Sequence, residues 1–123
     1  MASAPRGLLK LITLQLLSES SLSGAELQDQ IRRTSSGAWQ PGPGSIYFMI
    51  KGLRDESLIV ELPGAKGPSR RYVISNKGKA ELERKRKEVG VEVRKQLKIL
   101  AYYCGLAGDK KLSSSLSEIS STT

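Results

Sequence analysis

The sequence predicts a mainly helical (α+β) domain in which three helices precede a two-stranded β-hairpin and a long C-terminal helix. Three observations lead to this prediction. Apolar residues recur at helical spacing in three segments before residue 56. Two short alternating segments, 58–62 and 70–75, enclose a loop rich in Pro and Gly. Residues 77–106 then carry an apolar stripe long enough for one continuous helix.

The first predicted helix, residues 8–17, is apolar on more than one side. Such a helix needs two buried faces, because apolar surface left in water is unfavourable. We expect one face to pack on the domain itself, and the other on a second subunit or on the C-terminal helix. The residues assigned to the subunit contact are Leu9, Ile12 and Leu16.

The second predicted helix begins with a strong capping signal. Ser23 and Glu26 have the spacing of a capping box, in which each side chain bonds the backbone N–H of the other residue. The periodicity extends this helix to about Arg33 and places Gln28 on its outward side. A loop over residues 34–42 follows.

The third predicted helix begins at Pro43, because the fixed φ of proline suits the first helical position. Its apolar residues, spaced three and four apart, form one inward face; they are Ile46, Met49, Ile50 and Leu53. Ser45, Tyr47 and Lys51 lie off this face. We therefore expect these three side chains to be available for contacts outside the domain.

The predicted hairpin has a basic tip, with Lys66 in its loop and Arg70 and Arg71 at the start of its second strand. Two strands alone are marginally stable in water, so the hairpin is expected to lean on the helices. This order of elements is that of a winged helix-turn-helix, in which the hairpin is the wing. Residues 6–75 are predicted to form this DNA-binding domain.

The last predicted helix, residues 76–106, carries apolar residues that find no partner within the domain. They are Val93, Leu97, Leu100 and Cys104, and their spacing of three and four is typical of a helix that pairs with another helix. Residues 107–123 are rich in Ser and Thr and are predicted to be a disordered tail. The alternative is a short helix that uses Leu112, Leu116 and Ile119.

The amino-acid composition limits the classes of function that are possible for this chain. Twenty Lys and Arg against twelve Asp and Glu give a net charge of +8, which suits a polyanionic partner. One cysteine and no histidine exclude an internal disulfide, Cys/His zinc sites and histidine-dependent catalysis. We expect neither an enzyme nor a bound cofactor or metal. Lys10 and Gln15 interrupt the apolar N-terminal segment, so a cytoplasmic protein without a membrane segment is expected.

Local sequence adds a resemblance. Residues 39–47, Trp-Gln-Pro-Gly-Pro-Gly-Ser-Ile-Tyr, resemble the start of the recognition helix in PadR-family transcriptional regulators. The leucine-rich segment 14–27 and the segment 71–78 are also similar to that family, so the resemblance covers about residues 8–82. Ala25 stands where the family usually has an aromatic residue, and Ser57 where it usually has glycine. Without that glycine, we expect the corner after the recognition helix to be built differently.

The resemblance implies a homodimeric repressor that binds a double-stranded DNA operator and pairs through its first and last helices. The predicted DNA-binding residues are Ser45, Tyr47, Lys51, Gln28, Lys66, Arg70 and Arg71. Two other functions stay open: a winged-helix module that binds proteins without reading DNA, and a membrane-surface protein that uses its basic last helix.

The resemblance also implies a small aromatic effector, because aromatic residues can stack on a ligand in the dimer cavity of this family; Trp39, Tyr102 and Tyr103 are the candidate contacts. The alternative for Trp39 is a loop residue that covers the core. The alternative for Tyr47 is packing against the wing, and for Cys104 it is a redox-sensitive thiol.

Overall fold

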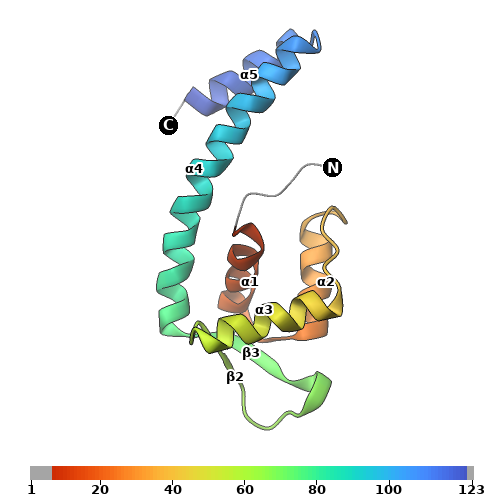
Figure 1. Cartoon of the computed structure of the whole chain (residues 1–123), viewed down its shortest axis with the longest axis vertical. Helices are drawn as coiled ribbons and strands as arrows, with labels where there is room; N and C mark the ends of the chain where they lie inside the picture. The colour runs from red at the N-terminus through yellow and green to blue at the C-terminus, as the bar shows by residue number, and fades with distance from the viewer. Residues whose placement is uncertain (1–6, 122–123) are drawn as a thin grey trace. The chain divides into compact units, whose positions relative to one another are not determined.

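The structure is a computed structural model, and it describes residues 7–121 of the chain. Its elements are α1 (Leu8–Glu19), β1 (Leu22–Ser23), α2 (Gly24–Thr34), α3 (Pro43–Asp55), β2 (Ile59–Glu61), a 3-10 turn (Gly67–Ser69), β3 (Arg71–Ile74), α4 (Asn76–Leu106) and α5 (Lys110–Ser121) (Figure 1). This order confirms the predicted mainly helical winged helix-turn-helix. The described chain divides into two compact units, residues 7–85 and residues 86–121. No described helix is both long and apolar enough to span a membrane.

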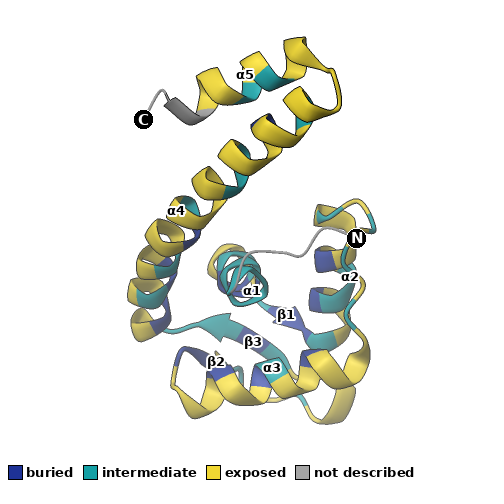
Figure 2. Ribbon diagram, turned by 45° about the horizontal axis from the view of Figure 1, so that its top comes forward, coloured by how far each residue is buried: buried dark blue, intermediate teal, exposed yellow. Residues whose placement is uncertain are grey.

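The core of residues 7–85 lies between α1, α2, α3 and the sheet. Of the four inward positions predicted for α3, Met49 is partly buried and the other three are buried in one cluster with Leu27 and Ile31 of α2; the three are Ile46, Ile50 and Leu53. Figure 2 shows that the opposite side of α3 is exposed. The hydrophobic face thus fixes which side of α3 points away from the domain.

Helix α1 is apolar on more than one side, and its own domain covers much of it. Leu14 and Leu17 are fully buried, whereas Leu9, Ile12 and Leu16 are partly buried against the core. The three residues assigned to a subunit contact therefore keep only part of their surface for a partner.

The sheet has three strands, in the order β1-β3-β2, and all pairs are antiparallel. The predicted hairpin is present as β2 and β3, with Val60 opposite Val73. The third strand, β1, was not predicted: it pairs Leu22 with Tyr72 and Ser23 with Arg71. Two residues are too short to produce an alternating pattern, so only the tertiary structure reveals this strand.

The corner between α3 and β2 keeps a left-handed residue although it has no glycine. Ser57 adopts φ 61°, and the N–H of Leu58 donates to the carbonyl of Leu53 at 2.9 Å. The expectation of a differently built corner is thus wrong, because serine occupies the positive-φ position itself. The hydroxyl of Ser75 donates to the Ser57 carbonyl at 2.6 Å and ties the corner to the start of α4.

In residues 86–121, α4 is followed by α5, so the predicted disorder of the tail is wrong and the short-helix alternative describes it better. Asp109 Oδ1 accepts from the N–H of Leu112 at 3.0 Å and caps the new helix. Ser113 Oγ donates to the carbonyl of Ala101 at 2.7 Å and links α5 to α4. A Ser-rich composition hid this link, because Ser113 connects α5 to α4 instead of belonging to a disordered tail.

Candidate nucleic-acid interface

The predicted DNA-contact residues of α3 lie on both flanks of its outward side, with Tyr47 and Lys51 on one flank and Ser45 on the other. Tyr47 and Lys51 are four residues apart and therefore neighbours, whereas Ser45 lies about 160° around the helix from Tyr47 at ~100° per residue. All three are exposed; the Lys51 side chain is 80% exposed and lies 3.9 Å from Asp55. Tyr47 is 55% exposed, so packing against the wing does not bury it.

Between these flanks stands a residue that the sequence prediction missed. Phe48 is 81% exposed, the highest value among the large apolar side chains of the described residues. It lies at the centre of the outward face, since the buried residues Ile46, Ile50 and Leu53 occupy the opposite side. Its position outside the inward stripe was visible in the sequence, but only the fold shows that nothing covers the ring.

The wing places cations beside α3, which contacts β2. Lys66 and Arg70 are exposed at and near the tip. Arg70 Nε and Arg54 Nη1 lie 3.9 and 3.5 Å from the same Glu61 oxygen. That oxygen accepts no hydrogen bond, so the two arginines are held by charge alone. Arg54 of α3 and Arg70 of the wing can therefore turn toward an approaching phosphate.

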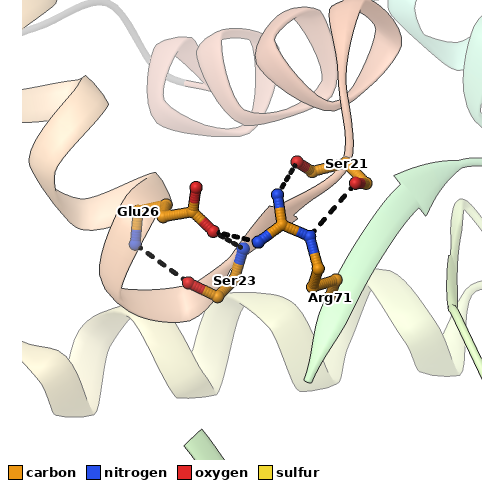
Figure 3. A network of polar contacts seen from close by, with 4 residues as sticks. All are labelled: Ser21, Ser23, Glu26 and Arg71. Atoms are coloured by element: carbon orange, nitrogen blue, oxygen red, sulfur yellow. Dashed lines mark hydrogen bonds and ion pairs between the residues drawn. The ribbon is translucent and has the colours of Figure 1, made fainter. Parts of the chain in front are cut away.

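Arg71 has a different environment from its neighbour Arg70 (Figure 3). Its guanidinium donates to Glu26, to the Ser21 carbonyl at 2.7 Å and to Ser21 Oγ at 3.2 Å. These contacts join β3 to the link between α1 and α2. The sequence did not reveal these structural partners of Arg71, and contact of its partly exposed side chain with phosphate stays a prediction.

Glu26 is also the predicted capping-box residue, and the capping box is confirmed. Its Oε1 accepts from the Ser23 N–H at 3.2 Å, and Ser23 Oγ accepts from the Glu26 N–H at 3.2 Å. The Ser23 N–H, with help from the Arg71 guanidinium, holds the pKa of the Glu26 carboxyl below its usual value. The Glu26 carboxylate thus both caps the N-terminus of α2 and binds Arg71 of the wing strand β3.

Gln28 positions the loop that leads into α3. Its side-chain N–H donates to the carbonyl of Pro41 at 2.9 Å, so the side chain is engaged within the domain. An open hollow of about 330 Å³ lies beside it, lined by α2 and residues 40–42. Ala25 contributes to this lining, where the PadR resemblance leads one to expect an aromatic ring.

The candidate effector residues lie in different parts of the structure. Trp39 is half-buried against the core of residues 7–85, and its backbone N–H donates to Ser35 Oγ at 2.9 Å. This geometry agrees with the alternative that Trp39 covers the core. Tyr102 and Tyr103 belong to residues 86–121, with ring centroids 6.3 Å apart and both side chains exposed. Among the described residues, no group of three or more acidic or cysteine side chains is placed to hold a metal ion.

The candidate dimer residues of α4 leave an apolar surface open. Val93 and Leu100 are exposed, and Leu97 and Cys104 are half-buried. Val91, Ile99 and Leu106 are exposed on the same helix. Apolar exposure on this scale is typical of a helix that pairs with another chain.

The helix order, the three-stranded sheet and the basic wing define a winged helix-turn-helix domain of the kind found in DNA-binding regulators. The chain belongs to the transcriptional regulator PadR-like family, whose model matches residues 13–84. That family consists of transcriptional regulators rather than enzymes.

One curated relative is transcriptional regulator YqjI of Escherichia coli (strain K12), which is 31% identical over 83 residues. The match covers 68% of this chain but only 40% of the relative, so this chain spans less than half the length of that protein. The PadR-like regulator BC4206 of Bacillus cereus has a similar fold, with a TM-score of 0.66 at 23% identity, over 77% of this chain and 93% of that one.

Structures of Bacillus subtilis PadR have been solved in complex with operator DNA and in complex with p-coumaric acid. Its complex with operator DNA is similar to this chain with a TM-score of 0.53 at 29% identity, over 62% of this chain and 45% of that one. Its complex with p-coumaric acid is similar with a TM-score of 0.52 at 22% identity, over 99% of this chain and 77% of that one.

Proposed function

We propose that this protein binds double-stranded DNA sequence-specifically as a homodimer and represses transcription from an operator. The observation that carries the proposal is the outward face of α3. It exposes Ser45, Tyr47 and Lys51, has no acidic residue before Asp55, and lies beside the cations of the wing. The operator complex of Bacillus subtilis PadR supports DNA as the partner.

In this proposal the N-terminal half of α3 enters the major groove, because that half is free of acidic side chains. Tyr47 and Lys51 contact base edges or phosphates from one flank, and Ser45 from the other. Lys66 and Arg70 of the wing contact the backbone. Arg71 contacts it only with the part of its side chain that Glu26 and Ser21 leave exposed; Gln28 acts by positioning residue 41.

A homodimer would bring two copies of α3 onto one operator. Val93, Leu97, Leu100 and Cys104 of α4, with the remaining surface of Leu9, Ile12 and Leu16, are the proposed contact. A two-fold dimer places two recognition helices about one helical turn of DNA apart, roughly 34 Å, so the operator should be pseudo-palindromic.

A small aromatic effector is also proposed. Support comes from the complex of Bacillus subtilis PadR with p-coumaric acid. Tyr102 and Tyr103 are the residues best exposed to contact such a ring, with Trp39 as a less accessible candidate. Release of the protein from its selected duplex by added p-coumaric acid, and loss of that release in Tyr102→Ala, would support this part.

The test of DNA binding is selection of bound duplexes from a random pool, followed by titration of the selected site at several salt concentrations. We expect one enriched pseudo-palindrome and an affinity that falls steeply with salt. Lys51→Ala should weaken binding about ten-fold and make the salt slope shallower by about one if Lys51 contacts phosphate. Lys111→Ala, which removes an equal charge from α5, is the matched control.

The opposite result is equally clear. If no sequence is enriched and affinity for every duplex stays in the micromolar range without salt dependence, the DNA-binding proposal is wrong. The winged helix would then be better explained as a protein-binding module.

A further inference from the structure

The geometry of α3 assigns a role to Phe48, the most exposed large apolar side chain that the structure describes. Helices usually turn such a ring toward the core, because burying it gains about 2 kcal/mol or more relative to exposure. Here the core side of α3 is already filled by Ile46, Ile50 and Leu53. The ring therefore stands in the middle of the surface that faces away from the domain.

The residues one turn before and one turn after Phe48 are both glycine. A Cβ added at Gly44 or Gly52 would meet no atom within 4 Å, so the space on both sides of the ring is open. A glycine inside a helix costs about 1 kcal/mol relative to alanine, and no packing contact here requires Gly52. The two glycines leave the ring unobstructed and let a flat surface approach the helix backbone closely.

The charged side chains near Phe48 indicate what kind of partner binds this face of α3. Lys51 follows Phe48 by three residues, and the wing adds Lys66 and Arg70. A protein interface normally surrounds such a ring with further apolar side chains. The residues one turn from Phe48 on α3 are instead small or polar: Gly44, Ser45, Lys51 and Gly52. An exposed ring with a lysine one turn away and no apolar rim on its own turn suits the major groove, where the apolar group presented is the C5-methyl of thymine.

We propose that Phe48 reads a thymine methyl group in each half of the operator. The inference rests on the proposed function, since it requires α3 to enter the major groove. It adds a specificity determinant that hydrogen-bonding residues cannot supply, because the methyl group is the only apolar feature of the major-groove base edges. Phe48 thereby selects T·A over C·G at one position of each half-site.

The test replaces thymine by deoxyuridine, which removes the methyl group and keeps base pairing and the O4 acceptor. A duplex selected by the wild-type protein is resynthesised with each thymine changed singly to uracil. At one position per half-site, affinity should fall about four-fold, the effect of one methyl group withdrawn from an apolar contact. Changing both half-sites should lower affinity about fifteen-fold.

Phe48→Ala links the effect to the ring. This variant should bind the thymine and uracil duplexes equally well, and in a new selection it should lose the preference at that position. Thermal unfolding should be unchanged, because the side chain it shortens is exposed. Leu112→Ala, which trims an exposed apolar side chain of α5, should keep the wild-type preference for the methyl group.

The outcomes separate this inference from the proposed function. If the wild-type protein selects a site but no uracil substitution weakens binding, or if Phe48→Ala stays as sensitive to uracil as the wild type, the inference is overturned while DNA binding stands. If no site is selected, both are overturned. If Phe48→Ala instead abolishes binding of another protein and leaves DNA binding intact, the ring serves a protein interface and the inference is wrong.

Discussion

Gly78 illustrates how one residue controls the junction between the wing and the last helix. A Cβ at this position would lie 2.0 Å from the Leu58 carbonyl oxygen and 2.6 Å from Ile74 Cγ1. The Leu58 carbonyl also accepts a hydrogen bond from Ser75 at 3.0 Å. Neither backbone can move without breaking this bond, so the first turn of α4 can pack this closely only with glycine.

Gly78→Ala is therefore expected to destabilise the protein by about 3 kcal/mol, the upper range for overpacking a close contact. Chemical denaturation followed by circular dichroism measures this free energy of unfolding. Gly90→Ala is the control: no atom lies within 4 Å of the added Cβ, so alanine should raise stability by up to ~1 kcal/mol. Equal effects of the two substitutions would contradict the packing argument.

Ser57 makes the opposite case, because here glycine should improve the fold. A residue other than glycine at φ 61° is strained, since Cβ crowds the backbone in the left-handed region. Ser57→Gly should stabilise the protein by about 0.5–1 kcal/mol after the larger entropy of the unfolded chain is included. The melting temperature reports the gain. Ser20→Gly, at an extended φ of −160°, should give no gain, and a gain there would show that strain is not the cause.

At the scale of elements, the polar network of Figure 3 fastens the wing to the helices. Arg71→Ala removes three side-chain hydrogen bonds that are partly exposed, and should lower the free energy of unfolding by about 1 kcal/mol at neutral pH. Arg33→Ala breaks an exposed ion pair within α2 alone and is the control, with a smaller expected loss of stability.

The same network sets a pH dependence. The pKa of Glu26 is lowered in the folded protein from its ordinary value of 4.5, so the folded state favours the ionised carboxyl. The stability this provides is present above that value and is lost as the pH falls through the lower, folded-state pKa. Arg71→Ala should make the loss of stability below pH 4.5 shallower. An unchanged pH profile would mean that Arg71 does not help to hold the carboxylate ionised.

Helix α3 offers a test that separates folding from function. Gly52→Ala should stabilise the free protein by up to ~1 kcal/mol, because alanine favours the helix and the added methyl meets no atom. The same methyl projects from the outward face, so binding of the selected duplex should weaken. Denaturation and DNA titration of one protein sample measure both effects. If binding improves together with stability, α3 does not approach DNA by this face.

The elements show which parts of the fold follow from sequence. The helices α2 and α3 were predicted correctly because capping, proline placement and a single apolar stripe agree with one another. The strand β1 depends on pairing with the distant residue Tyr72, which no local pattern contains. The helix α5 had a local signal in the spacing of its apolar residues and in Asp109, but the Ser-rich composition favoured a disordered tail. At the interface, exposure of Tyr47 and Lys51 followed from periodicity, whereas the partners of Arg71 and the open ring of Phe48 required tertiary structure.

At the scale of the whole molecule, DNA binding should depend on pairing of two chains through α4. Leu100 is 51% exposed on the proposed contact stripe, and a glutamate there would carry charge into an apolar interface. Leu100→Glu should sediment as a monomer at concentrations where the wild type is a dimer. Its affinity for the selected pseudo-palindrome should fall at least a hundred-fold, because each copy of α3 would bind its half-site alone.

The control is Val60→Glu, which places the same charge at an exposed apolar residue of β2 and should remain dimeric. A Leu100→Glu protein that still sediments as a dimer would show that α4 does not pair the chains through this stripe.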